Sequence, residues 1–536
     1  MPVWLGLATL AGGFYLLVAA LAYDVAGFPL DDAWIHQTYA RNLAATGQWA
    51  FVPGQASAGS TSPLWSLLLS LGYWLGLPYQ AWTYALGIAS LGLTGWTVTR
   101  LGRHLFPGRP WVGPLAGLFC IVEWHLVWAS VSGMETMLCT WLSVLVLELW
   151  LVADRHEVAG DAGQPENAEP TLRAVRSSRL AVIARWWGLG MVGGLLALTR
   201  PEGLVLIGLI GLVIGWRLRR APWRLLQAWA AIGAGLVLPL APYLVFHYAT
   251  TGLPFPNTFY AKQQEYRLLL SLYPVWQRWL MMVAVTLVGA QVLLLPGFVY
   301  AVGRSINVAV TGNSDARLPA SGSPQLPASY VLLPAAWWFI HLTLYAVRLP
   351  VSYQHGRYQM PVIPLFVLIG LGGSAYLIRP RARNLVSRLL SRAVIASTGL
   401  VLFVFLVLGA RAYATDVAFI QGEMVATASW LAAHVPPDSL IAGHDIGALG
   451  YFTPRPLLDL AGLVTPEVIP FITDESHLID FMQAKSANYV VFFPDWSDAY
   501  RRMAQDPRLE PVYATGFEWT RRQGRANMTV YRLHPP

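Results

Sequence analysis

The sequence predicts a polytopic α-helical membrane protein that ends in a small α/β domain. Only 12% of the 536 residues are charged, about half the fraction found in soluble globular domains. Apolar runs close to the length that crosses a bilayer as a helix recur from the N-terminus to residue 411. Beyond residue 411 they give way to short β-branched and aromatic segments bounded by Pro, Gly or Asp.

Eleven apolar runs have about the length of a membrane helix. They cover residues 4–23, 81–99, 111–130, 135–153, 184–199, 202–216, 226–248, 279–302, 328–347, 360–378 and 393–411. The first run lacks a preceding basic segment and a clear cleavage site, so we expect a retained helix rather than a signal peptide. We expect an interfacial or re-entrant helix at the shorter run, 63–78. The predicted membrane module is therefore 1–411, with a first extracytoplasmic loop at 24–80.

Basic residues set the predicted orientation, because short cytoplasmic loops are rich in Lys and Arg. With a cytoplasmic N-terminus, the inner loops hold 19 arginines, and the outer loops before the C-terminal domain hold 7 basic residues. A crossing at 63–78 would reverse this bias. The inner segments 154–183 and 303–327 are rich in Gly, Ser, Pro and Ala, and we expect them to be flexible and non-catalytic.

The C-terminal domain, 412–536, is predicted to be extracytoplasmic. SLIAGH, PLLDL, NYVVFF, EPVYAT and MTVYRL are typical of strands, and segments 420–434, 476–486 and 497–505 are typical of helices between them. No basic stretch with interleaved aromatics indicates nucleic-acid binding. Cys120 and Cys139 both lie in apolar segments, so we expect no disulfide framework.

Two adjacent acids, Asp31 and Asp32, follow the first membrane-length run. Asp31 is a candidate helix N-cap, because Ile35, Tyr39 and Leu43 recur at helical spacing after it. That interpretation leaves Asp32 unexplained, since it lies about 100° further round the helix. Adjacent carboxylates repel, so a cation, a metal or a proton should lie beside them. A carboxylate at this position could also act as a general base that deprotonates an attacking hydroxyl.

A phosphate leaving group would need cationic partners. The predicted outer face offers Arg200, Lys262, His355 and Arg357 from distant parts of the sequence. Each has an ordinary alternative: Arg200 pairing with Glu202, Lys262 reaching out of the membrane interface, and His355 and Arg357 as loop polars. Their convergence on one face favours a shared site.

Other ionisable groups are ambiguous. Glu135 in SGMET is either an acid near a helix start or a second acid in the site. Glu123 and His125 lie inside a predicted span, where ionisable groups are functional candidates, although a structural pair is an equal alternative. For His444 and Asp445 in HDIGALGY we expect a structural turn after a strand, because no third metal ligand is nearby.

The segment DDAWIHQTYARNLAATGQWAFVPGQASAGSTSPLW resembles the first extracytoplasmic loop of GT-C glycosyltransferases, polytopic enzymes that use polyprenyl-phosphate sugars. SGMET, LTRPEG, PNTFYAK, HGRYQMP and HDIGALGYF…LLDLAGL resemble, in the same order, segments of the mycobacterial-type arabinofuranosyltransferase branch. The likeness extends over most of the chain apart from the two low-complexity segments.

The resemblance implies a GT-C membrane module with juxtamembrane helices in the first loop. It implies an inverting transfer of sugar from a polyprenyl-phosphate donor to a cell-envelope glycan, lipid or protein, with Asp32 or Asp31 as the base. Some members bind a divalent metal such as Mg or Mn near these acids. The substrate-binding residues that it suggests are His36, Glu135, Arg200, Glu202, Asn257, Tyr260, Lys262, His355, Arg357 and Tyr358.

The chain departs from this branch at Val52 and Gln55, where relatives carry an Asn before the Pro-Gly pair and an acid after it. Arabinose is therefore not assumed as the sugar. Two alternatives remain. A lipid-glycan flippase would show paired halves, and we find no such repeat. A non-catalytic scaffold would leave the clustering of polar motifs on one face unexplained.

Overall fold

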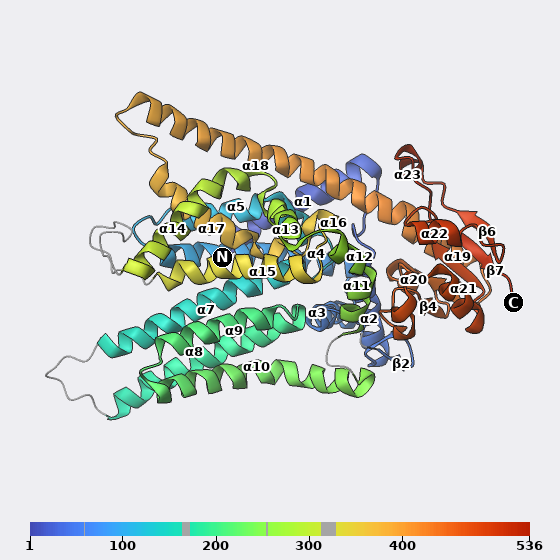
Figure 1. Cartoon of the computed structure of the whole chain (residues 1–536), viewed down its shortest axis with the longest axis horizontal. Coiled ribbons are helices and arrows are strands. Elements are labelled where there is room, and N and C mark those ends of the chain that lie inside the picture. Colours follow the sequence, from blue (N-terminus) through green and yellow to red (C-terminus); the bar gives the residue numbers. More distant parts are fainter. Residues whose placement is uncertain (58, 163–171, 253–255, 312–327, 536) are drawn as a thin grey trace.

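The structure, a computed structural model, describes residues 1–57, 59–162, 172–252, 256–311 and 328–535. The helices run roughly along the long axis of the molecule, and the C-terminal domain caps one end of them (Figure 1). Parts of the two low-complexity segments predicted to be flexible, 163–171 and 312–327, lie outside the described residues.

Helices cover all eleven predicted spans. Within the described ranges, eight helical segments are long and apolar enough to cross a membrane, or nine if one bent pair counts as a span. The eight are α1 (Pro2–Tyr23), α7 (Thr136–Ala162), α8 (Leu172–Thr199), α10 (Pro222–Thr251), η1 with α14 (Ala290–Leu294, Leu295–Thr311), α15 (Ser329–Arg348), α16 with η3 and α17 (Tyr353–Gly356, Met360–Val362, Ile363–Leu377), and α18 with η4 and α19 (Leu385–Ile420, Gln421–Val425, Ala426–His434).

The predicted count of eleven is higher by two, because two predicted spans fail either the length or the hydropathy expected of a membrane helix. The run 81–99 lies in α4 (Tyr79–Leu105), which is long but rich in Thr, Ser and Gly. The run 202–216 forms α9 (Gly203–Arg217), which has only 15 residues. A helix of that length extends about 22 Å, less than the ~30 Å hydrocarbon core.

Two predicted spans are interrupted. The run 111–130 divides into α5 (Val112–Val122) and α6 (Trp124–Ser130), which meet at 60°. At the bend the Glu123 carboxylate accepts the Leu126 N–H at 3.0 Å and an amide N–H of Gln291 at 2.5 Å, and it lies 2.7 Å from His125 Nδ1. These contacts favour the structural alternative for Glu123 and His125. The run 279–302 is broken at Gly289 (φ 111°), between α13 (Val275–Leu287) and η1.

The first loop folds into a compact cap. It contains α2 (Asp32–Thr46), an antiparallel hairpin of β1 (Ala50–Val52) and β2 (Gln55–Ala56), and α3 (Pro63–Trp74). With 12 residues, α3 is about 18 Å long and too short to cross, as predicted for 63–78. The short helices α11 (Asn257–Glu265) and α12 (Arg267–Leu272) lie at the same end of the molecule (Figure 1).

The C-terminal domain has a strand at each of the five predicted segments. They are β3 (Ile441–Gly443), β4 (Leu457–Asp459), β5 (Tyr489–Phe492), β6 (Leu509–Ala514) and β7 (Thr529–Leu533). The sheet order is β4-β3-β5-β7-β6, in which β3 pairs parallel with β4 and β5, and β7 pairs antiparallel with β5 and β6. Helices α21 (Glu475–Ala484) and α22 (Asp498–Met503) match predictions, whereas α20 (Gly447–Phe452), η5 (Pro466–Phe471) and α23 (Glu518–Arg522) were not expected.

No loop separates the membrane module from this domain. Helix α18 has 36 residues and continues through the π-helical turn η4 into α19, across the predicted boundary at residue 411. Figure 1 shows it running along one edge of the bundle to the C-terminal domain.

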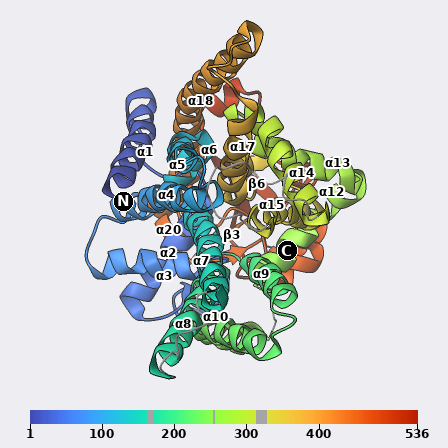
Figure 2. The same cartoon turned by 90° about the vertical axis from the view of Figure 1, so that its left-hand side faces the viewer.

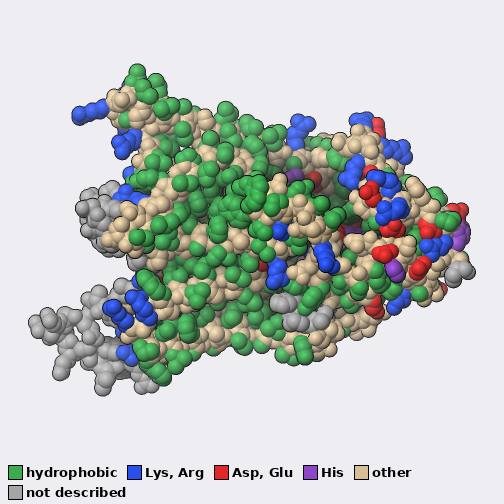
Figure 3. Space-filling model, in the orientation of Figure 1, with side chains coloured by type: hydrophobic (Ala, Val, Ile, Leu, Met, Phe, Trp, Pro, Cys, Tyr) green, Lys and Arg blue, Asp and Glu red, His purple; other side chains and the backbone are tan. Residues whose placement is uncertain are grey.

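The two ends of the molecule differ in charge. From the end opposite the C-terminal domain, α8 and α10 lie together below α4, α5 and α17 (Figure 2). At that end Lys and Arg side chains gather, whereas both signs of charge are mixed over the C-terminal domain (Figure 3). The predicted orientation, with the arginine-rich end in the cytoplasm, depends on this asymmetry.

Candidate active site

A cavity of about 760 Å³ lies where the first loop, α11, several membrane-helix ends and the C-terminal domain meet. Its lining comes from segments more than 400 residues apart in sequence. Nine of the twelve residues predicted for the site line it: Asp31, Asp32, His36, Glu135, Arg200, Glu202, Lys262, Arg357 and Tyr358. Asn257, Tyr260 and His355 are not part of its lining.

Asp31 binds the C-terminal domain. Its carboxylate oxygens accept the backbone N–H groups of Gly447 at 2.7 Å and Ala448 at 2.8 Å, where α20 begins. It makes no side-chain cap to its own helix, so it caps a different helix from the one considered in the sequence. A Cβ at position 447 would collide with the backbone oxygen of Asp31, so glycine permits this approach. Burial and the nearby Asp445 raise the pKa of Asp31 to about 8.

Asp32 faces the cavity. Its side chain is 37% exposed and forms an ion pair with Arg357, whose side chain is 2% exposed. Burial acts to raise the pKa of Asp32, but Arg357 and Lys262 outweigh this effect and hold it at about 2. Asp32 is therefore ionised at neutral pH and accessible from the cavity, whereas Asp31 is committed to a structural contact.

Three cationic side chains surround the ring of Tyr358. Lys262 Nζ donates to the phenol oxygen at 2.6 Å and Arg357 Nη2 at 3.0 Å, and the Arg200 guanidinium carbon lies 4.9 Å from the ring centroid. Nε and Nη1 of Arg357 are buried and have no hydrogen-bond partner among the described residues. Buried donors are rarely left unpaired, so these two are candidate positions for the oxygens of an anion.

The backbone before Arg357 is unusual. Gln354, His355 and Gly356 all have positive φ values, 54°, 56° and 68°, which costs free energy at the two non-glycine positions. His355 Nε2 lies 2.8 Å from an Asp416 carboxylate oxygen on α18. His355 therefore anchors this turn from outside the cavity, while Arg357, two residues later, lines it.

Arg200 is fixed by two acids. Its guanidinium forms an ion pair with Glu135 at 2.5 Å and donates to the Tyr345 hydroxyl at 3.3 Å, which in turn donates to Glu202 at 2.6 Å. Arg200 thus reaches Glu202 through Tyr345 rather than by the direct pairing considered in the sequence. Burial opposes ionisation of Glu135, but Arg200 and His36 hold its pKa well below the usual range.

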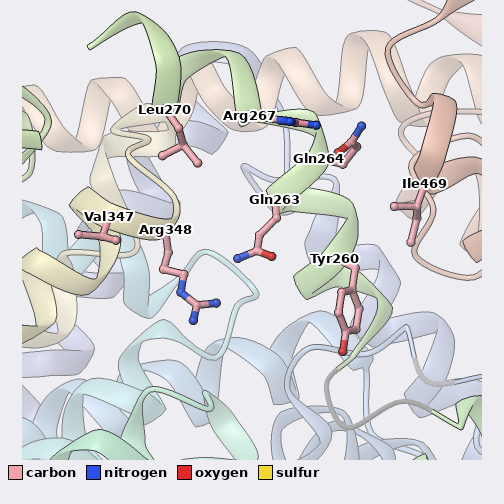
Figure 4. A pocket seen from close by; sticks show the side chains of 8 residues that line it. All are labelled: Tyr260, Gln263, Gln264, Arg267, Leu270, Val347, Arg348 and Ile469. Carbon is pink, nitrogen blue, oxygen red and sulfur yellow. The ribbon is translucent and has the colours of Figure 1, made fainter. Parts of the chain in front are cut away.

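A second pocket of about 500 Å³ lies beside α11 and α12 (Figure 4). It is lined by Tyr260, Gln263, Gln264, Arg267, Leu270, Val347, Arg348 and Ile469. Gln263 and Arg348 line both pockets and converge in Figure 4. Asn257 lies at the start of α11, where its amide donates to the Leu463 carbonyl at 3.3 Å. Tyr260 and Asn257 are therefore neighbours of the main cavity.

Solved structures of membrane glycosyltransferases share this architecture. ArnT from Cupriavidus metallidurans, solved with undecaprenyl phosphate, matches with a TM-score of 0.53 and 16% identity, over 99% of each chain. The oligosaccharyltransferase of Archaeoglobus fulgidus, tethered to an acceptor peptide, matches with a TM-score of 0.57 and 10% identity, over 95% of this chain and 72% of that one. This chain is a multi-pass membrane protein with the GT-C fold.

Two sequence matches add to the GT-C fold. The chain is 31% identical over 243 residues to a terminal β-(1→2)-arabinofuranosyltransferase from Mycobacterium tuberculosis. That match covers 43% of this chain and 34% of the relative, so it spans about a third of the relative's length. Residues 413–531 match a family described as a domain of unknown function, DUF8728. The resemblance to GT-C enzymes, arabinofuranosyltransferases among them, is confirmed.

The GT-C cavity also contains side chains that were not predicted for it. His444 and Asp445 follow directly after β3, as the predicted turn requires, but their side chains also line the cavity, with Glu265 and Trp496. The His-Asp pair at the start of HDIGALGY, at the end of a predicted strand, could have indicated cavity-lining residues. Glu265 and Trp496 gave no such signal, because only the fold brings them to the others.

A divalent metal has no evident ligand set in this arrangement. Among the described residues, no group of three or more His, Cys, Asp or Glu side chains is placed to hold one. Asp31 is occupied by two backbone N–H groups and Asp32 by Arg357. The two acids therefore do not present a common set of free oxygens. Dependence on Mg or Mn stays a prediction.

Proposed function

We propose that this chain is a glycosyltransferase that moves a sugar from a polyprenyl-phosphate donor to a cell-envelope acceptor. The observation that carries the proposal is the cavity itself, where an ionised, accessible Asp32 lies against a cluster of Arg357, Lys262 and Arg200. An acid that accepts a proton and cations that hold a phosphate are the two requirements of the reaction.

Asp32 is the proposed general base. It takes the proton of an acceptor hydroxyl as that oxygen attacks the anomeric carbon, and the bond from that carbon to the phosphate oxygen breaks. Attack opposite the leaving phosphate inverts the anomeric centre. Arg357 currently pairs with Asp32. A phosphate that competes for this guanidinium would release the carboxylate for catalysis, so donor binding and activation of the base are coupled.

The proposed phosphate ligands are Arg357, Lys262 and the Tyr358 hydroxyl, with Arg200 behind them. Lys262 has no carboxylate within ion-pair distance in the part of the chain that the structure describes, so its charge is available to a ligand. The apolar side chains Val205, Leu344 and Leu349 line the same cavity and suit the first units of a prenyl chain. The ArnT structure with undecaprenyl phosphate and an archaeal oligosaccharyltransferase structure with a dolichol phosphate support a donor of this class.

The proposed setting is the cell membrane, with the N-terminus in the cytoplasm and the cavity and C-terminal domain outside. The arginine-rich end seen in Figure 3 supports this orientation. The acceptor is a glycan, lipid or protein of the envelope, and a divalent ion remains a candidate cofactor.

The proposal is tested with purified protein in nanodiscs and a panel of labelled polyprenyl-phosphate sugars, with and without EDTA. Transfer or release of one sugar supports the proposal, and loss of turnover with EDTA would establish a metal requirement. Donor binding without turnover of any sugar, unaffected by Asp32→Asn, would instead favour the flippase or scaffold alternatives.

A further inference from the structure

The C-terminal domain forms a wall of the cavity. His444 and Asp445 contribute to it from the turn after β3, Trp496 from the loop after β5, and Glu265 of α11 lines the same cavity. None of these residues has a part in the proposed base or phosphate site. The wall therefore needs a separate explanation.

Trp496 is exposed where its domain otherwise buries such residues. It is 41% exposed, and it is the only large hydrophobic side chain counted as exposed in the described part of 412–536. Its ring lies 5.0 Å from that of His444, at 60°. An aromatic face held open beside polar groups is suited to a ligand that has both an apolar face and hydroxyl groups.

The polar groups around Trp496 are partly buried and incompletely paired. His444 lies 3.7 Å from Glu265 and 3.7 Å from Asp445, beyond hydrogen-bond length. Asp445 Oδ2 and His444 Nδ1 have no hydrogen-bond partner among the described residues. Two carboxylates can accept hydroxyl protons from a ligand, whereas they would repel a phosphate.

This wall lies next to the proposed base. The N–H groups of Gly447 and Ala448 bind Asp31, the residue before Asp32. Asp445 is two residues before Gly447, and it is close enough to Asp31 to act on its charge. Asp445 and Asp32 line the same cavity, so a ligand held by Asp445 lies in the cavity that contains the proposed base.

We propose that the C-terminal domain supplies the acceptor subsite and that it binds a carbohydrate. A sugar ring of the acceptor packs its C–H face on Trp496, and its hydroxyl groups donate to Asp445 and Glu265. The His444 ring lies between these two carboxylates, 3.7 Å from each. This inference rests on the proposed function and deepens it: the acceptor is a glycan rather than a peptide or a phosphorylated lipid headgroup.

The test measures steady-state kinetics in nanodiscs with the donor identified from the panel and a synthetic oligosaccharide acceptor. Trp496→Ala and Asp445→Asn should each raise the KM for the oligosaccharide about tenfold, with little change in the KM for the donor. Trp496→Phe should recover most of the loss. Asp498→Asn is the matched control, because Asp498 is exposed on α22 and pairs with Arg501.

Unchanged acceptor KM in both variants, or an equal loss with a peptide acceptor, would overturn the assignment. A second measurement separates this inference from the proposed function. If the wild-type protein turns over no donor, binding of the oligosaccharide is measured directly by saturation-transfer NMR. Binding that Trp496→Ala abolishes would support the carbohydrate subsite without the transferase, and no binding to the wild type would refute the subsite.

Discussion

Two buried regions hold acids in opposite ways. At the junction between α18 and the C-terminal domain, the Glu423 carboxylate accepts hydrogen bonds from Thr515, Thr520, Asn527 and the Met528 N–H. In the cavity, Asp32 has one strong partner and an open side. A carboxylate whose oxygens all accept hydrogen bonds stabilises the fold, since a substitution there leaves the buried donors unpaired. An acid with an incomplete set can exchange partners, as a catalytic group must.

The largest expected effect is at Asp32. Asp32→Asn keeps the shape of the side chain but cannot accept a proton, so kcat should fall at least about 100-fold. The midpoint of thermal unfolding should also fall, because the variant leaves the buried Arg357 guanidinium without its carboxylate partner. Transfer assays and a melting curve on the same preparation check both. Full activity in this variant would remove Asp32 as the base and end the contrast with Glu423.

The next effect is at Arg357. Its free Nε and Nη1 suit two oxygens of one phosphate, and lysine offers a single point of contact. Arg357→Lys should therefore lower kcat/KM for the donor by about 10- to 100-fold, whereas Arg501→Lys on the exposed face of α22 should have no effect. A near-normal rate in Arg357→Lys would mean that charge alone holds the donor.

A substitution of Glu423, at the junction between α18 and the C-terminal domain, should lower stability and leave activity unchanged. Glu423→Gln places an amide N–H against donors that now point at a carboxylate, at a cost of about 1–3 kcal/mol. The unfolding midpoint should fall by several degrees, while the KM for the donor stays the same. A kinetic change without a change in the midpoint would contradict the structural role of Glu423.

The last prediction concerns the pH dependence of stability. The folded pKa of Asp31 is about 8, above its ordinary value of 3.8, so between these values the folded state holds a proton that the unfolded state releases. The free energy of unfolding should then decrease as pH rises from about 4 to about 8, by at most ~1.4 kcal/mol per unit. Asp31→Asn should flatten this dependence in melting curves. An identical slope in the variant would show that another group causes it.

The sequence anticipates elements that depend on local pattern. The five strands of the C-terminal sheet follow from short β-branched segments with turn residues at their ends, and α3 follows from an apolar run too short to cross. Interruptions are harder to predict. The apolar run through Glu123 continues without a break in sequence. The bend could not be predicted, because the contacts of Glu123 with Gln291 and His125 form only in the folded chain.

The site could be predicted in part for the same reason. Charged residues at the ends of apolar runs on one face identify Asp32, Arg200 and Arg357 as neighbours. His355 carries the same signal but turns away, because the strained backbone at 354–356 sends it to α18. Trp496 lines the cavity only because the C-terminal domain packs against the membrane module, and no local sequence pattern predicts that packing.

The uninterrupted helix from Leu385 to His434 also acts as a ruler. This helix joins the membrane module to the C-terminal domain, so its number of residues sets the distance of Trp496 from the other helices. One residue more would raise the domain by about 1.5 Å and swing it by about 100°. A change in the length of this helix would therefore displace Trp496 from the rest of the cavity lining.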